Sequence, residues 1–158
     1  QQALLLLGRA REERLEPNAI TYNAGISACV GDGQWQQALI LLGELWDVKL
    51  QPDVITYSAA ISATEKGGQW EHAMWLLSEV RRVGLEPTCM SYSAGISACE
   101  KGEQWQRALS LHYEMCKVEL ERDVVSFNAV ISACEKGNHW EEALLLFGEL
   151  RKTSLEPS

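Results

Sequence analysis

Two sets of short polar residues recur along the chain at a constant spacing of 35 residues. The first set is Asn23, Ser58, Ser93 and Asn128, and the second is Asp53, Thr88, Asp123 and Ser158. Their amides, hydroxyls and carboxylates can donate or accept hydrogen bonds. No histidine or acidic residue recurs beside the hydroxyls at a spacing that would activate one of them as a nucleophile. The pattern gives no support to an enzyme, and we expect no catalytic residue in this chain.

The charge balance of the chain is acidic. Its 158 residues include 22 acidic and 14 basic side chains, so the formal net charge is −8. This balance gives no bulk electrostatic reason to expect nucleic acid or an anionic membrane as a partner. The longest apolar runs, at residues 4–7 and 143–147, are far shorter than the roughly 20 residues of a spanning helix. We therefore expect no membrane partner.

Cysteines and histidines do not form metal-ligand patterns. The five cysteines lack a C-x-x-C pair, and their odd number favours a reduced compartment. Three of them recur on one apolar stripe and are expected in the core: Cys29, Cys99 and Cys134. His72, His112 and His139 occupy three different positions of the repeat, which excludes a repeated ligand set, and we expect them at the surface. No metal site, cofactor or small-molecule substrate is predicted.

The 35-residue period extends to the residues that must build the fold. Tryptophan recurs at Trp35, Trp70, Trp105 and Trp140, and alanine, isoleucine, serine and glutamate positions repeat in the same register. A period of this length indicates a supersecondary unit that cannot bury its apolar face alone, so units must stack. We expect an all-α fold, a right-handed α-solenoid of stacked antiparallel helix pairs. The first helices of the pairs should line its concave face.

Two apolar stripes define the helices of each unit. The first helix has the i, i+3, i+4, i+7 spacing of a buried face, formed by Tyr22, Gly25, Ile26 and Cys29. A glycine-rich turn follows, where the backbone needs left-handed or unhindered conformations. The second helix begins at a tryptophan, which we expect to be mostly buried. Its apolar stripe is Ala38, Leu39, Leu42 and Leu45.

This pattern divides the chain into four complete units and one partial unit. The complete units are residues 19–53, 54–88, 89–123 and 124–158. Residues 1–18 are predicted to be the second helix of a truncated preceding unit, because Ala3, Leu4 and Leu7 match the stripe of the second helix. Together the units form one solenoid domain.

The units resemble pentatricopeptide repeats. The resemblance rests on Ile20-Thr21-Tyr22-Asn23 and Ile55-Thr56-Tyr57-Ser58, each followed by a glycine turn, and on closing steps such as Pro52-Asp53. It covers essentially the whole chain, and the uniform unit length is similar to the P-type class. The resemblance implies sequence-specific binding of single-stranded RNA, one base per repeat, in organellar RNA processing, stability or translation. A mitochondrial or chloroplast location follows from the same resemblance.

The resemblance also implies roles for the two polar sets. The base-reading pairs would be Asn23 with Asp53, Ser58 with Thr88, Ser93 with Asp123, and Asn128 with Ser158. By the family's pairing rules, Asn with Asp suggests U, Ser with Asp suggests G, and Asn with Ser leans to C or U. Ser with Thr has no assigned preference.

Two further sets match family positions that contact RNA. Apolar side chains that wedge between bases would be Ile20, Ile55, Met90 and Val125. Phosphate-binding lysines would be Lys66, Lys101 and Lys136, whereas the first unit has Gly31 at that position. Counting two helical turns from the base-reading residues places Glu65, Glu100 and Glu135 at the edge of the same groove.

Two of these sets, the residues at the unit ends and the lysines, also have a structural explanation. Five residues that precede a predicted first helix, or stand at the chain end, are favoured N-cap types: Asn18, Asp53, Thr88, Asp123 and Ser158. The lysines would complement the negative end of a helix dipole. Because the net charge opposes phosphate contacts, we expect weak RNA binding by this chain. A protein- or peptide-binding helical-repeat scaffold remains the alternative function.

Overall fold

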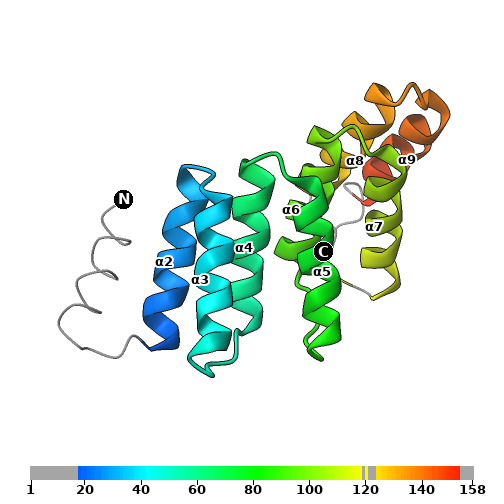
Figure 1. Ribbon diagram of the computed structural model, residues 1–158. Helices are drawn as coiled ribbons and strands as arrows, with labels where there is room; N and C mark the ends of the chain where they lie inside the picture. Colours follow the sequence, from blue (N-terminus) through cyan, green and yellow to red (C-terminus); the bar gives the residue numbers. More distant parts are fainter. Residues whose placement is uncertain (1–17, 119, 121–123, 154–158) are drawn as a thin grey trace.

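The structure of the chain is a computed structural model that describes residues 18–118, 120 and 124–153 (Figure 1). This part of the chain contains eight helices and no strand. The helices are α2 (Ala19–Gly31), α3 (Trp35–Asp47), α4 (Val54–Lys66), α5 (Trp70–Arg82), α6 (Cys89–Lys101), α7 (Trp105–Lys117), α8 (Val124–Lys136) and α9 (Trp140–Thr153). First helices therefore start every 35 residues, as do second helices. The predicted second helix at residues 1–18 lies outside the described residues, apart from Asn18.

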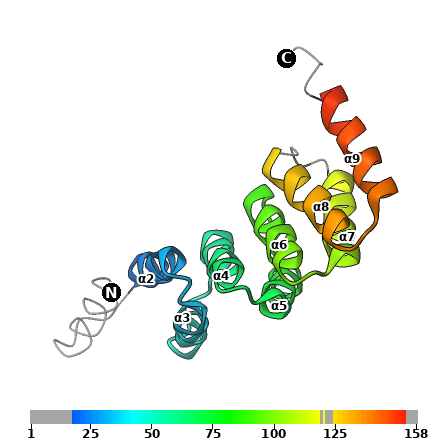
Figure 2. The same cartoon turned by 90° about the horizontal axis from the view of Figure 1, so that it is seen from above.

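The helices form two rows. Helices α2, α4, α6 and α8 follow the inner side of a curved array, and the second helices of the pairs, α3, α5, α7 and α9, lie on its outer side (Figure 2). Each inner helix packs against the next inner helix, and α3, α5 and α7 each pack against their own inner helix and the following one. Within the described residues, the backbones of neighbouring outer helices stay apart, and only side chains bridge them, such as Trp35 on α3 and His72 on α5. The prediction of an all-α solenoid is confirmed, and grooves remain between the outer helices.

The inner helices begin at the predicted caps. Side-chain oxygens of Asn18, Asp53 and Thr88 accept hydrogen bonds from the backbone N–H groups three residues later. These bonds satisfy donors that an α-helix leaves unpaired at its first turn. Three of the five predicted caps are therefore confirmed. The other two, Asp123 and Ser158, lie outside the described residues.

The core is built from the predicted stripe of the inner helices. Tyr22, Gly25, Ile26 and Cys29 are the buried residues of α2. The aromatic position at the start of this stripe is buried in all four units, at Tyr22, Tyr57, Tyr92 and Phe127. In α3 the buried set is Ala38, Leu41, Leu42 and Leu45. Leu39, which the sequence pattern placed in that set, is only half-buried.

The tryptophans depart from the expectation of deep burial. Trp35, Trp70 and Trp105 are half-buried, and Trp140 is 63% exposed. The first three lie against glycines at the end of the next inner helix, namely Gly67, Gly102 and Gly137. Among the described residues no inner helix follows α9, so Trp140 lacks such a neighbour. The burial of each tryptophan thus depends on the following unit.

The glycines of the turns have two different functions. A Cβ atom on Gly67 would lie 2.3 Å from Cδ1 of Trp35, so Gly67 permits close packing. The left-handed backbone conformation belongs instead to the next residue, Gly68, with φ of 68°. Glu103 and Asn138 adopt the same conformation at the equivalent positions. The prediction of a left-handed backbone in this turn is therefore correct for Gly68. Gly67 instead leaves space for the ring of Trp35.

Alanine should have opposite effects on stability at a glycine packed against a side chain and at a glycine in open space. Gly67→Ala should lower the free energy of unfolding by about 1–3 kcal/mol, because Trp35 must move away from the new Cβ. Gly43→Ala in the middle of α3 should raise it by about 0.5–1 kcal/mol, because no atom lies within 4 Å of the added Cβ and the unfolded chain loses freedom. Urea denaturation of both variants measures the difference. Equal effects of the two changes would contradict the packing role of Gly67.

The cysteines agree with the sequence analysis, whereas one histidine does not. Cys29, Cys99 and Cys134 are buried free thiols, and burial raises the pKa of Cys99 to about 11. His112 was expected at the surface but is fully buried in α7, edge-on to Phe127 with ring centroids 4.7 Å apart. It occupies a position that is leucine in the two preceding units. None of the helices in the described part has the length and apolarity to cross a membrane.

Candidate functional site

The first predicted base-reading pair forms a hydrogen-bonded cluster with a third residue. Asn23 on α2 donates from Nδ2 to Oδ1 of Asp53 at 3.5 Å. Asp53 caps α4, and its Oδ1 also accepts the backbone N–H of Thr56 at 2.8 Å. The Thr56 hydroxyl lies within hydrogen-bond distance of both Asn23 Oδ1 and Asp53 Oδ1, and its single proton can serve one of them at a time. Residues 30 positions apart are thus joined at the start of α4.

The Asp53 carboxylate stays ionised in this cluster. Partial burial acts to raise its pKa, but hydrogen bonds from the Thr56 backbone, the Thr56 hydroxyl and Asn23 outweigh burial and lower the pKa below the ordinary aspartate value. An ionised carboxylate only accepts hydrogen bonds, while the neighbouring Asn23 amide can also donate. Because folding lowers this pKa, the cap contributes stability above the ordinary pKa and loses it as the pH falls through the lowered value.

The second pair forms a cluster of three hydroxyls. Ser58 Oγ lies 3.3 Å from Thr88 Oγ1 and 2.8 Å from Ser91 Oγ. Ser58 also donates to the backbone carbonyl of Val54 at 2.7 Å. The Thr88 and Ser91 hydroxyls are 3.1 Å apart. Compared with the first pair, this cluster has no amide and no charge.

The third and fourth pairs are only partly described. Ser93 is buried on α6, and Asn128 is exposed on α8. Their predicted partners, Asp123 and Ser158, lie outside the described residues. The structure therefore brings together two of the four predicted pairs and does not bear on the other two.

Thr56 and Ser91 were missed as members of the site. Each is the third residue of an inner helix, and each contacts the polar pair of the preceding unit. A signal was present in the sequence, since a hydroxyl residue recurs at this position in every unit, at Thr21, Thr56, Ser91 and Ser126. Its partner could not be inferred, because the contact crosses from one unit to the next.

The predicted wedge residues form an exposed apolar row. Ile20, Ile55, Met90 and Val125 each lie in the first turn of an inner helix, and they are between 60% and 77% exposed. Apolar side chains at equivalent positions of four stacked helices are all left in solvent. Such a row is typical of a surface that contacts a partner.

A cleft joins the wedge residues to the second polar pair. Its volume is about 540 Å³, and it runs along the inner helices α2, α4 and α6. Ile55 and Met90 belong to its lining, as do Ser58 and Thr88. The remaining lining is apolar or small, including Val54 and Ala59. The cleft therefore offers two apolar side chains from adjacent units and a hydroxyl cluster between them.

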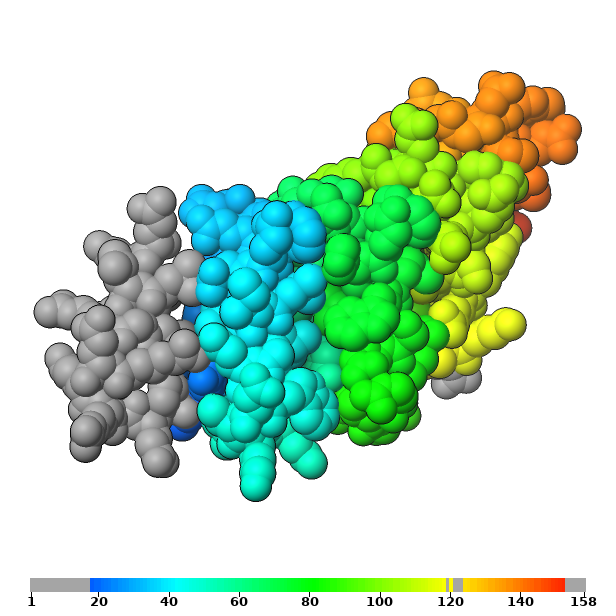
Figure 3. All heavy atoms as spheres, in the orientation of Figure 1, coloured from blue at the N-terminus to red at the C-terminus, as the bar shows by residue number. Residues whose placement is uncertain are grey.

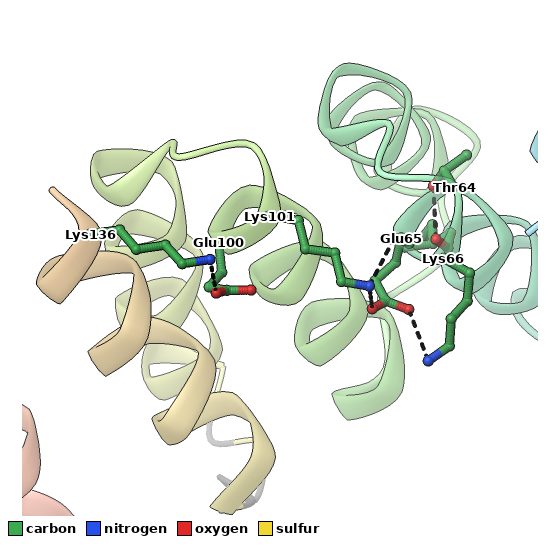
Figure 4. Close-up of polar contacts among 7 residues, drawn as sticks. Thr64, Glu65, Lys66, Glu100, Lys101 and Lys136 are labelled. Atoms are coloured by element: carbon green, nitrogen blue, oxygen red, sulfur yellow. Dashed lines mark hydrogen bonds and ion pairs between the residues drawn. The ribbon is translucent and has the colours of Figure 1, made fainter.

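Two of the three predicted phosphate-binding lysines, Lys101 and Lys136, are engaged in ion pairs between units (Figure 4). Lys101 Nζ lies 2.6 Å from Oε1 of Glu65, and Lys136 Nζ lies 2.5 Å from Oε1 of Glu100. The hydrogen bond to Glu100 raises the pKa of Lys136. Lys66 has a glutamate only at 3.9 Å, its neighbour Glu65. The charges of Lys101 and Lys136 are thus compensated by carboxylates of the preceding unit.

The described residues hold no group of three or more histidine, cysteine, aspartate or glutamate side chains that could bind a metal ion. The inner face offers hydrogen-bonding groups, exposed apolar side chains and charged side chains.

Comparison with sequence families gives one consistent result. The profile of the PPR repeat matches residues 55–85, 90–119 and 125–154. A PPR repeat family profile matches residues 17–66, and a pentatricopeptide repeat domain profile matches residues 1–32. No curated protein sequence matches the chain significantly.

Solved structures with the same fold include two plant proteins. The PPR domain of Arabidopsis thaliana protein-only RNase P 1, crystallised in complex with tRNA, has a TM-score of 0.84 and 15% identity, with 99% of this chain and 83% of that chain covered. The pentatricopeptide repeat protein PPR10 from maize has a TM-score of 0.71 and 26% identity, with 98% and 22% covered. PPR10 in complex with an 18-nt psaJ RNA element has a TM-score of 0.78 and 18% identity, with 96% and 22% covered. The chain spans about a fifth of PPR10.

Proposed function

The chain belongs to the pentatricopeptide repeat family, and from this premise we propose that its inner face binds single-stranded RNA, one base per helix pair. The observation that carries the proposal is the inner cleft, in which the predicted wedge residues Ile55 and Met90 flank the predicted base-reading residues Ser58 and Thr88. A base inserted there would contact apolar side chains on its faces and polar groups at its edge. Contact with base faces adds affinity without choosing the base, and edge contacts choose it.

The two described pairs offer different hydrogen-bonding groups to a base. Asn23 supplies an amide beside the Asp53 carboxylate, a combination that can donate to and accept from the edge of a pyrimidine. We assign U to this unit, as the family's pairing rules suggest. Ser58 and Thr88 supply only hydroxyls, which leave more space and discriminate less.

Related structures support RNA as the class of ligand. Two similar structures are complexes with RNA, the Arabidopsis domain with tRNA and PPR10 with an 18-nt element. We further propose a role in organellar RNA processing, stability or translation, without catalysis by this chain. The net charge of −8 and the paired lysines keep the affinity of the chain low.

The proposal is tested by comparing single-stranded RNA with a duplex of the same sequence. The splayed bases of a single strand can enter the inner cleft, whereas bases in a duplex are paired and stacked. We expect measurable binding of a uridine-containing single strand in low salt and at least about tenfold weaker binding of the duplex. Equal affinities would show that the chain recognises only phosphate charge.

Releasing the paired lysines should strengthen RNA binding. In the double variant Glu65→Gln with Glu100→Gln, the charges of Lys101 and Lys136 are no longer compensated. Two freed lysines acting on phosphates should steepen the salt dependence of a single-strand complex by up to roughly 1.4 log units per log unit of salt. Titrations at two salt concentrations measure this change.

A control variant with the same change in net charge separates the effect of the freed lysines on RNA affinity from the effect of overall charge. Glu71→Gln with Glu141→Gln removes the same number of carboxylates from the first turns of outer helices. We expect a much smaller gain in affinity from this control. If both variants bind RNA equally well, the lysines do not contact the strand.

A further inference from the structure

Equivalent positions at successive interfaces between outer helices allow an internal comparison. Between α5 and α7, Arg81 reaches across to Tyr92 of α6, donating from Nη2 to the hydroxyl at 2.9 Å. The same Nη2 lies 2.7 Å from Oε2 of Glu114 on α7. The Arg81 guanidinium also lies over the Tyr92 ring, 5.7 Å from its centroid. At this interface an arginine of the chain bridges a tyrosine and a glutamate.

The interface between α3 and α5 has the tyrosine and the glutamate but no such arginine. The residues 35 positions earlier are Trp46, Tyr57 and Glu79. Trp46 is 43% exposed. Tyr57 is fully buried, and its hydroxyl makes no hydrogen bond of normal geometry. Among the described residues, only the Trp46 indole acts on it as a hydrogen-bond donor. A buried hydroxyl so poorly satisfied costs free energy, so this position is unusual.

The interface between α7 and α9 lacks the hydroxyl altogether. There the equivalent residues are Cys116 and Phe127. A tyrosine thus accompanies an arginine at one interface, and a phenylalanine replaces the tyrosine where the arginine is absent. Tyr57 is the described member of this series that keeps the hydroxyl without the guanidinium.

An open cleft lies where an arginine in place of Trp46 would extend. It has a volume of about 750 Å³ and opens on the outer face, where α3 and α5 lie side by side (Figure 3). Its lining includes Trp46, Tyr57, Trp75 and Glu79. Trp75 is 53% exposed, so two indole rings are available to a cation at its rim. Gly43 leaves part of the α3 wall without a side chain.

The charged groups of the cleft favour a cation. Its lining contains the carboxylates of Glu71 and Glu79 and one guanidinium, that of Arg82. Arg82 binds both oxygens of Glu79, donating from Nε to Oε2 at 2.8 Å and from Nη2 to Oε1 at 2.5 Å. Each carboxylate oxygen keeps a lone pair for a second donor. Burial and the charge of Glu79 raise the pKa of the Tyr57 hydroxyl, which the Trp46 indole and Arg82 offset only in part. The hydroxyl therefore remains neutral and can accept a hydrogen bond.

We propose that this outer cleft docks a basic segment of a partner protein. An arginine of that segment takes the place of the Trp46 indole between Tyr57 and Glu79, as Arg81 lies between Tyr92 and Glu114. A planar guanidinium can serve the hydroxyl, the carboxylate and an indole face together, which a lysine ammonium cannot do as well. The cleft is much larger than one guanidinium, and Leu39 and Leu42 line the rest, so apolar residues beside the arginine also find contacts. This inference does not rest on RNA binding by the inner face.

The first test uses blocked tripeptides in which arginine, lysine or leucine stands between two leucines. Binding to the chain is followed by NMR through the indole N–H signals of Trp46 and Trp75. We expect the arginine peptide to bind at least about fivefold more tightly than the lysine peptide, and the leucine peptide to bind weakest. Equal binding of the leucine peptide would overturn the proposal, because the cleft would then be a purely apolar groove.

Two variants test the geometry. Tyr57→Phe should weaken the arginine peptide at least about threefold and leave the leucine peptide unchanged. Trp46→Arg should rebuild the arrangement of the next interface, raise Tm by about 2 °C or more, and abolish arginine-peptide binding. Cys116→Arg is the matched control, since Phe127 offers no hydroxyl and no rise in Tm is expected.

The results that would contradict the proposal can be told apart from a failure of a variant to fold. If Trp46→Arg still binds the arginine peptide like the unchanged chain, the guanidinium position is wrong. If Trp46→Arg does not fold, Tyr57→Phe decides the question, since a conservative loss of one hydroxyl preserves the core. Equal effects of Tyr57→Phe on all three peptides would overturn the proposal as well.

Discussion

Replacement of Trp105 by alanine is expected to lower the free energy of unfolding by about 3 kcal/mol. Trp105 packs against Gly137 of the next inner helix, and its ring lies 3.5 Å from the ring of His139, centroid to centroid. Truncation would leave a void between two units that the short Gly137 cannot fill. The expected cost is at the low end for a large aromatic residue, because Trp105 is only half-buried.

Trp140→Ala is the matched control for this prediction. Trp140 occupies the same position of its unit but is 63% exposed. Its truncation should cost less than about 1 kcal/mol. Urea denaturation of both variants gives the comparison. Similar costs for the two tryptophans would mean that the contact between units contributes little, and the stacking account of the solenoid would be wrong.

The largest expected effect on RNA binding comes from placing charge on the exposed apolar row. The double variant Ile55→Glu with Met90→Glu removes apolar contacts with base faces and puts two carboxylates at the inner cleft. Loss of these contacts should cost about 2 kcal/mol of binding free energy, which is roughly a 30-fold loss of affinity. Both residues are more than 60% exposed, so the fold should survive, and a thermal melt checks this.

Outer helices provide a control with the same change of charge. Ile40 and Leu144 are also more than half exposed, but they lie on α3 and α9. Ile40→Glu with Leu144→Glu should alter RNA affinity less than about twofold, because distant surface charges are screened by salt. If the control weakens binding as much as the inner variant, net charge and not the inner cleft governs binding.

The sequence was sufficient to predict the helices and their stacking. The stripe from Tyr22 to Cys29 has helical spacing, and a buried stripe of that kind depends mainly on residues within one helix. The period then implied identical neighbours for every unit. For this reason the fold and the caps at Asn18, Asp53 and Thr88 could be predicted.

Features that depend on contacts between units were predicted poorly. Lys101 was interpreted from its neighbours in the chain, but its carboxylate partner Glu65 lies 36 residues away. Trp140 is similarly exposed because, within the described residues, no later inner helix lies against it. His112 is buried because a histidine occupies a leucine position of the stripe, which the count of histidine spacings did not reveal.

The hydrogen-bonded clusters of the inner face were likewise predicted only in part. The resemblance to pentatricopeptide repeats implied the pairs Asn23 with Asp53 and Ser58 with Thr88, and the structure places each pair within hydrogen-bond distance. The hydroxyls of Thr56 and Ser91 were not identified, because the turn that brings them to the preceding unit is a tertiary feature. The outer cleft beside Tyr57 was also invisible in the sequence, where the tyrosine is simply one of a repeated set.

The central claim is that each unit of the inner face selects one RNA base. Its most direct test is a selection from randomised single-stranded RNA, run in parallel with the unchanged chain and with Asn23→Ser. The unchanged chain should enrich a U and a G separated by one base, from the units of Asn23 and Ser93. Asn23→Ser should convert that U to G and leave the rest of the motif unchanged. An unchanged motif, or no positional preference with either chain, would contradict the claim.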